Sequence, residues 1–201
     1  MKTYLNYLLE SSYTKYDKTI AIIAGSYKPP TAGHLYMVEH YSKIADDVIV
    51  LISNPQNKNS MRITNLGTVI TPEMSKQIWD IYVERYKLPN IKILISNEPS
   101  PIKSMCKYID DELKDVNVIL GTSTKDNNNE RYEFATKYYA NNSNINLLNP
   151  IDTAIEPYKI DDEKIISAAD VRNNIDNPEL IKTMLPNKLI DTDIDSVIKI
   201  L

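Results

Sequence analysis

The residues best suited to chemistry lie in one short segment, residues 25–34, which reads Gly-Ser-Tyr-Lys-Pro-Pro-Thr-Ala-Gly-His. It follows an apolar run at 20–24 and precedes a segment at 35–44 with apolar residues at helical spacing. A turn rich in glycine and proline therefore leaves a buried strand and opens a helix. The first turn of a helix offers unpaired N–H groups and the positive end of the helix dipole. The 25–34 turn is thus predicted to bind an anion such as phosphate.

Four side chains or backbone positions of this turn suit that role. Gly33 has no Cβ, so backbone and phosphate can approach each other closely. His34 can donate a hydrogen bond to a phosphate oxygen, and more strongly as charge builds in a transition state. The hydroxyl of Thr31 can donate to the same phosphates, and Lys28 lies within reach of them. The plainer alternative is that Thr31 only caps the helix and His34 is an exposed helical residue.

A second segment, residues 166–172, reads Ile-Ser-Ala-Ala-Asp-Val-Arg. Ser167 and Asp170 have the spacing of a helix capping box, and on that reading Arg172 is a surface charge. Taken alone, this segment predicts a helix start and no more.

The elements around these segments alternate between strand and helix. Continuous β-branched and aliphatic runs predict strands at 19–24, 47–52, 91–95, 116–120 and 145–148. Helical spacing and Thr-Pro or Ser-Pro starts predict helices at 31–44, 71–88, 100–113 and 130–139. Polar loops are predicted at 53–70 and 121–129, an irregular segment at 149–164, and short helices near 168–175, 178–185 and 192–200.

This alternation predicts an α/β fold, with a Rossmann-like five-stranded parallel sheet, helices on both faces and a short C-terminal helical region. We expect one domain over 1–201, made of an N-terminal helix (1–17), an α/β core (18–165) and C-terminal helices (166–201). Ligands of such sheets bind beyond the carboxyl ends of the strands. The segments 25–34, 53–62 and 121–131 all follow strands, so they are predicted to form one site.

Composition restricts the partners. The net charge of −4 and the pI near 5.3 argue against nucleic acid as a partner. No apolar run is long enough to span a membrane, and no signal peptide is predicted. The single cysteine is consistent with a reducing cytoplasm. No cluster of cysteine and histidine indicates a protein-bound metal.

Taken together, the two segments resemble the signatures of the nucleotidyltransferase superfamily that carries (H/T)-x-G-H after its first strand. The tetrad here is Thr-Ala-Gly-His at 31–34, and Thr in the first position is the variant of phosphopantetheine adenylyltransferases. Residues 166–172 resemble the superfamily's I-S-x-[ST]-x-[IV]-R element. Ala169 departs from that pattern, because the family usually has a hydroxyl residue there. Sequences of this kind also occur in large tailed bacteriophages.

The resemblance implies roles for individual residues. His34, Lys28 and Arg172 would be catalytic. The implied nucleotide-binding residues are Gly25, Ser26, Tyr27, Thr31, Gly33, His34, Gly121, Ser167 and Arg172. The implied substrate-binding residues are Lys58, Arg62, Asp126 and Arg131, and no protein ligand to a metal is implied.

The activity implied is transfer of a nucleoside monophosphate from a triphosphate to a small phosphorylated acceptor, with release of pyrophosphate and with Mg²⁺ accompanying the triphosphate. The second segment looks closer to that of nicotinamide-mononucleotide adenylyltransferases than to the R-T-x-G-[IV]-S-T-T form of cytidylyltransferases, which favours ATP over CTP. Two alternatives stay open: a cytidylyltransferase acting on an alcohol phosphate, and a catalytically silent nucleotide-binding module, which Ala169 favours. Homo-oligomerisation also stays open.

Overall fold

The computed structural model describes residues 15–55, 61–126, 130–160 and 165–201, without the side chains of residues 126, 130 and 131. The predicted N-terminal helix falls mostly at 1–14, outside the described residues.

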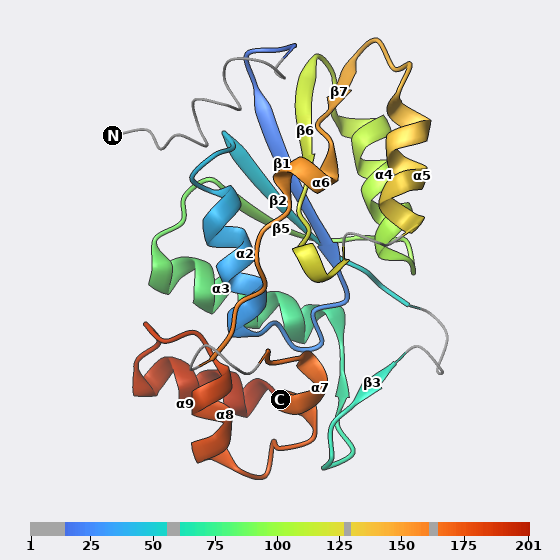
Figure 1. The fold of residues 1–201 in the computed structure, drawn as a ribbon. Helices are drawn as coiled ribbons and strands as arrows, with labels where there is room; N and C mark the ends of the chain where they lie inside the picture. Colours follow the sequence, from blue (N-terminus) through green and yellow to red (C-terminus); the bar gives the residue numbers. More distant parts are fainter. Residues whose placement is uncertain (1–14, 56–60, 127–129, 161–164) are drawn as a thin grey trace.

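A five-stranded parallel sheet forms the centre of the molecule (Figure 1). Its strands stand in the order β5-β2-β1-β6-β7. From β1 the chain first adds β2 and β5 toward one edge of the sheet and then adds β6 and β7 toward the other edge, so the strand order switches between β1 and β6. The five strands are β1 (Thr19–Gly25), β2 (Asp47–Ile52), β5 (Ile91–Ile95), β6 (Val116–Leu120) and β7 (Ile145–Leu147). The predicted Rossmann-like α/β fold and its five strands are confirmed.

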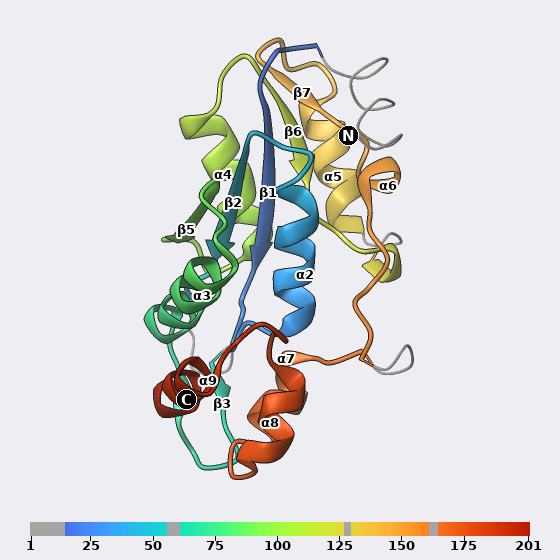
Figure 2. The ribbon, with the colours of Figure 1, turned by 90° about the vertical axis from the view of Figure 1, so that its left-hand side faces the viewer.

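Helices cover both faces of the sheet. The helices are α2 (Ala32–Tyr41), α3 (Pro72–Tyr86), α4 (Pro101–Glu112) and α5 (Glu130–Tyr139). Alternate residues of β1 explain the two layers: Ala21 and Ile23 pack with α2 and α3, whereas Ile20 and Ile22 pack with α4 and α5. Figure 2 shows α2 and α4 on opposite sides of β1. Within the described residues, no helix has the length and apolar character needed to cross a membrane.

The structure corrects two expectations about loops. The segment predicted as one polar loop, 53–70, contains the antiparallel pair β3 (Arg62–Ile63) and β4 (Val69–Ile70), whose two-residue strands are too short to show a period in sequence. The segment predicted as irregular, 149–164, contains α6 (Pro150–Thr153). The side chain of Asn149 caps α6 by accepting a hydrogen bond from the N–H of Ile151, at 3.1 Å.

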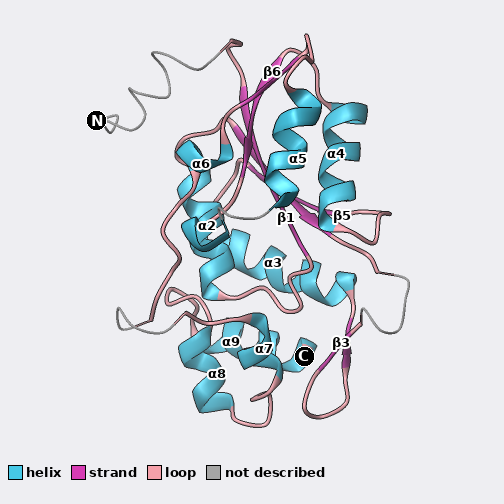
Figure 3. Ribbon diagram, turned by 45° about the vertical axis from the view of Figure 1, so that its right-hand side comes forward, coloured by secondary structure: helices cyan, strands magenta, loops and turns pink. Residues whose placement is uncertain are grey.

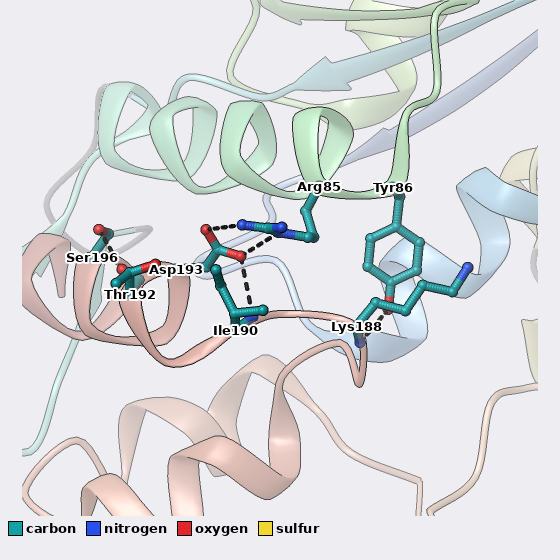
Figure 4. Close-up of polar contacts among 7 residues, drawn as sticks. All are labelled: Arg85, Tyr86, Lys188, Ile190, Thr192, Asp193 and Ser196. Atoms are coloured by element: carbon teal, nitrogen blue, oxygen red, sulfur yellow. Dashed lines mark hydrogen bonds and ion pairs between the residues drawn. The ribbon is translucent and has the colours of Figure 1, made fainter.

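The C-terminal helices α7 (Ala168–Arg172), α8 (Pro178–Met184) and α9 (Asp191–Ile200) gather at one end of the molecule, below α3 in Figure 1. An ion pair holds α9 against α3: Arg85 donates to both carboxylate oxygens of Asp193, at 2.6 and 3.1 Å (Figure 4). Nearby, the N–H of Lys188 donates to the hydroxyl of Tyr86, at 3.1 Å. The second predicted segment, at α7, is tied to the 25–34 turn by a hydrogen bond from the Arg172 guanidinium to the carbonyl oxygen of Lys28.

Candidate functional site

A cavity of about 180 Å³ lies at the carboxyl ends of β1 and β6, where the strand order reverses. Open parallel sheets bind ligands at this position. The cavity joins four segments of the chain, and the residues that line it include Gly25, Ser26, His34, Gly121, Tyr132 and Ala168. The 25–34 turn, the loop after β6 and the start of α7 therefore meet at one place.

Tyr27 is one of the residues that line this cavity. Its backbone has a positive φ of 46°, which turns the side chain back toward β1, and its hydroxyl donates to the carbonyl oxygen of Ile23 at 2.8 Å. The ring lies so close to Gly25 that a Cβ there would be 2.8 Å from it, so the turn requires glycine at that position. Burial raises the pKa of the Tyr27 hydroxyl well above its usual range.

The Tyr27 ring also links the site to the core. It meets the imidazole of His34 edge-to-face, with ring centroids 5.1 Å apart. On another side it meets the indole of Trp79, at 5.4 Å. Trp79 is fully buried, and its indole N–H has no hydrogen-bond partner among the described residues.

His34 is held as a neutral hydrogen-bond donor. Its Nδ1 accepts the N–H of Thr31 at 2.9 Å, and the hydroxyl of Thr31 lies 3.1 Å from the same nitrogen. Because Nδ1 accepts, the ring proton resides on Nε2. Burial, together with the charge of Lys125, lowers the pKa of His34 from 6.5 to about 4. The imidazole thus offers a neutral N–H donor at physiological pH.

Three cationic residues from three segments lie near enough to one another, at the turn, for their charges to interact. Lys28 is only 3% exposed, and burial followed by the charge of Arg62 lowers its pKa, against a smaller opposing effect of Glu73. Burial and Arg62 likewise lower the pKa of Arg172. The guanidinium of Arg172 donates to the carbonyl oxygen of Lys28 at 2.6 Å, across 144 residues of sequence.

We refer to Lys28, Arg62 and Arg172 as the cation cluster. Among the ion pairs of the described residues, none includes a member of this cluster. Cations held together without a paired carboxylate leave a positive potential, which an anion would relieve.

The second segment lies against this cluster, and its serine makes a capping box. The hydroxyl of Ser167 donates to a carboxylate oxygen of Asp170 at 2.6 Å and accepts the N–H of Asp170 at 3.2 Å. Ala168 lines the cavity, and Ala169 is exposed. This segment therefore both caps the start of α7 and lies beside the 25–34 turn.

The two remaining glycines of the predicted site differ in what surrounds them. A Cβ at Gly121 would lie 2.6 Å from Cγ1 of Ile23, so the loop after β6 needs glycine for packing. A Cβ at Gly33 would meet nothing closer than 3.8 Å, at Thr31 and Tyr158. The fold itself therefore does not require glycine at position 33.

The other predicted residues are placed as follows. Ser26 lines the cavity. Arg62 lies in β3, within the cation cluster. Lys58 and the side chains of Asp126 and Arg131 lie outside the described part of the structure.

The sequence analysis did not identify two residues near the site, one close to His34 and one in the lining of the cavity. Lys125, in the short 3₁₀ helix Thr124–Asp126, acts electrostatically on His34, and Tyr132 of α5 lines the cavity. Lys125 could have been proposed from sequence, because it is a basic residue in the loop that follows the fourth strand.

No protein-family model matches the chain. Solved structures resemble it over 90% of its length at 14% identity. One is a Vibrio parahaemolyticus protein assigned as a nicotinate-nucleotide adenylyltransferase, with a TM-score of 0.53 and 98% of that chain covered. A second is the bifunctional NMN adenylyltransferase/ADP ribose pyrophosphatase of Francisella tularensis, with a TM-score of 0.61 and 49% of that chain covered. A third is the nicotinic acid mononucleotide adenylyltransferase of Plasmodium falciparum complexed with APC, with a TM-score of 0.53 and 95% covered. The likeness shows that the chain shares the fold of these proteins.

Proposed function

We propose that the protein is a nucleotidyltransferase that transfers a nucleoside monophosphate, AMP in preference to CMP, from a triphosphate to a small phosphorylated acceptor. One observation carries the proposal: His34, a neutral imidazole donor, lines the cavity at the sheet's switch point, and the cation cluster gathers around Lys28 of the same turn. The fold shared with adenylyltransferases of nicotinate and nicotinamide mononucleotide supports adenylyl transfer, and a nucleotide-type acceptor.

The reaction needs no side-chain nucleophile. An oxygen of the acceptor's phosphate attacks the α-phosphorus in line, the new O–P bond forms, and the bond to the bridging oxygen of pyrophosphate breaks. The attacking phosphate is already anionic, so no proton must be removed from it. The protein's contribution is then orientation of the two phosphates and stabilisation of the charge that shifts onto the leaving group.

Each residue of the site has a part in this scheme. His34 donates from Nε2 to a non-bridging phosphate oxygen, and Thr31 fixes the ring through Nδ1. The cation cluster binds the β- and γ-phosphates and the departing pyrophosphate. Gly33 lets the phosphates approach the start of α2, where backbone N–H groups are unpaired.

Mg²⁺ fits this site as a companion of the triphosphate. The described residues contain no group of three histidine, cysteine, aspartate or glutamate side chains that could hold a metal ion. The ion would therefore be held mainly by phosphate oxygens and would offset their charge. A crystal structure of the Francisella tularensis protein contains AMP and a manganese ion, in line with a divalent cation at such a site.

The alternative of a silent nucleotide-binding module rests on α7. The hydroxyl of Ser167 already donates to Asp170, and Ala169 brings no second hydroxyl, so this segment offers fewer donors to a triphosphate than the superfamily pattern implies. A module of this kind would bind ATP without turnover.

A panel of ATP and CTP against phosphorylated acceptors, read by pyrophosphate release, separates these functions. The acceptors are nicotinamide mononucleotide, nicotinate mononucleotide, phosphopantetheine, glycerol phosphate and choline phosphate. We expect release with ATP and a nucleotide-type acceptor. Release only with CTP and an alcohol phosphate would favour the cytidylyltransferase. ATP binding by calorimetry without release from any pair would favour the binding module.

A further inference from the structure

The β3–β4 hairpin places one of its two faces toward the cation cluster. Arg62 pairs with Ile70 across the hairpin, and Ile63 pairs with Val69. Residues directly opposite in an antiparallel pair share a face. Ile70 is fully buried, whereas Ile63 and Val69 are 54% and 38% exposed, so the face that Arg62 shares with Ile70 is the inner one, and Arg62 lies at its solvent-exposed border. This orientation agrees with the effect of Arg62 on Lys28 and Arg172.

The tip of the hairpin is a closed turn. The N–H of Thr64 donates to the carbonyl oxygen of Thr68 at 2.9 Å, and the N–H of Thr68 donates to the hydroxyl of Thr64 at 3.1 Å. Gly67 supplies the positive φ of 85° that closes the turn. The hairpin therefore behaves as one unit, and whatever fixes its tip also fixes Arg62.

Asn65 fixes that tip to α7. Its N–H donates to the carbonyl oxygen of Arg172 at 2.9 Å, and its side-chain Nδ2 donates to a carboxylate oxygen of Asp176 at 2.7 Å. Figure 3 shows β3 beside α7 at the end of the molecule away from α4 and α5. One residue thus contacts the backbone of Arg172 and, through the closed turn, sets the position of Arg62.

We propose that Asn65 is a positioning residue, which holds Arg62 and Arg172 at the spacing that lets both contact one polyphosphate chain. The proposal rests on the function proposed above, since it concerns the same site. Two cations on separate segments repel each other, so an external contact must keep them together before the anion arrives. The hydrogen bonds of Asn65 provide such a contact, and a preorganised pair binds its ligand without first being ordered.

The test measures binding of inorganic tripolyphosphate, by calorimetry, to the full chain. We expect Asn65→Ala to weaken binding roughly three- to tenfold, as loss of the side-chain hydrogen bond to Asp176 implies, since alanine keeps the backbone N–H that donates to Arg172. Arg62→Ala should weaken it at least as much. The double variant should bind no more weakly than Arg62→Ala alone, because alanine keeps the backbone contact with Arg172 and the lost side-chain contact matters only for holding Arg62 beside it. Losses that multiply in the double variant would overturn the proposal.

Two substitutions at position 176 separate the hydrogen bond from the charge. Asp176→Asn and Asp176→Ala both remove the carboxylate, but only asparagine retains an oxygen that can accept from Asn65. We expect Asp176→Asn to bind tripolyphosphate more tightly than Asp176→Ala by the factor lost in Asn65→Ala. Equal binding of tripolyphosphate by the two variants would refute the positioning role of the hydrogen bond between Asn65 and Asp176. Leu66→Ser, at the exposed position next to Asn65, is the control and should bind as the unaltered protein does.

Hydrogen exchange distinguishes failure of this proposal from failure of the proposed function. Asn65→Ala should speed exchange of the amides at 62–70 and leave the sheet amides unchanged, whether or not the protein is an enzyme. If the unaltered protein neither bound tripolyphosphate nor released pyrophosphate, the proposed function would fail. If it bound and Asn65→Ala bound equally well, only the positioning role would fail.

Discussion

At the scale of single residues, His34 is the donor on which the proposed chemistry depends. Replacing it with alanine removes the Nε2–H and should lower kcat by roughly 10²- to 10³-fold, as loss of one charge-stabilising donor does in other enzymes. Pyrophosphate release at saturating ATP measures the effect. The only other histidine, His40, lies on the same helix with its ring against Tyr41, and His40→Ala should leave turnover unchanged. Turnover of His34→Ala within a few-fold of the unaltered protein would contradict the assigned role.

The protonation of His34 gives a second prediction. Its pKa is about 4 in the folded protein and 6.5 as an ordinary histidine, so between these values the unfolded chain binds a proton that the folded chain does not. The free energy of unfolding should therefore be fully retained above pH 6.5 and fall as the pH drops from 6.5 toward 4. Urea unfolding from pH 7 to pH 5 measures this slope, and His34→Gln should reduce it. A ring-proton titration by NMR with a midpoint near 6.5 for His34 would disprove the assignment.

The glycines provide a third prediction, which separates ligand approach from packing. Gly33→Ala should leave thermal stability unchanged or slightly higher, since its Cβ meets no atom within 3.8 Å and alanine favours helix. If phosphate approaches the backbone there, the same substitution should weaken ATP binding. Gly121→Ala places a Cβ 2.6 Å from Ile23 and should lower the free energy of unfolding by about 1–3 kcal/mol. Calorimetric titration and thermal unfolding of both variants make the comparison, and unaltered ATP binding by Gly33→Ala would argue against close approach.

At the scale of elements, the contact between α3 and α9 holds the C-terminal helices against the α/β core. Breaking the Arg85–Asp193 pair with Asp193→Asn should loosen the C-terminal helices and weaken ATP binding, while the sheet stays intact. Hydrogen exchange of the amides at 166–201, against those of β1 and β2, measures this. Lys76→Ala removes an exposed pair on the same helix, Lys76–Asp80, and serves as the control.

The same pair has a defined pH dependence. The hydrogen bond from Arg85 is the main cause that lowers the pKa of Asp193 below 3.8. Its stabilisation is therefore present above that value and is lost as the pH falls through the lowered pKa. At neutral pH the ion pair between Arg85 and Asp193 should be fully formed.

At the scale of the whole molecule, the sheet was predictable and the contacts between distant segments were not. Strands such as β2 were readable because a continuous β-branched run carries a local signal of burial on both faces. The helix α6 had a readable start at Asn149-Pro150, the same cap and proline that marked α8 at Asn177-Pro178, but four residues are too few to show a helical period.

The candidate site divides in the same way. The 25–34 turn is a local strand–turn–helix unit, so its position at the sheet's carboxyl end followed from sequence. The bond between Asn65 and Asp176 spans 111 residues, and no local pattern encodes such a pairing. Likewise, Ser167 carried two readings in sequence, and the structure shows its hydroxyl engaged with Asp170. The contacts between distant segments were thus the part of the site that could not be predicted from sequence.

The position of Trp79 has a practical consequence. It is the only tryptophan of the chain, it is fully buried, and its indole is separated from the imidazole of His34 by a single ring, that of Tyr27. Light absorbed selectively by indole therefore excites one fluorophore, which lies directly behind the proposed phosphate site. A nucleotide that shifts His34 or Tyr27 should change the fluorescence emission of Trp79. Occupancy of the site can therefore be followed by fluorescence in the unlabelled protein, including in single-turnover stopped-flow experiments.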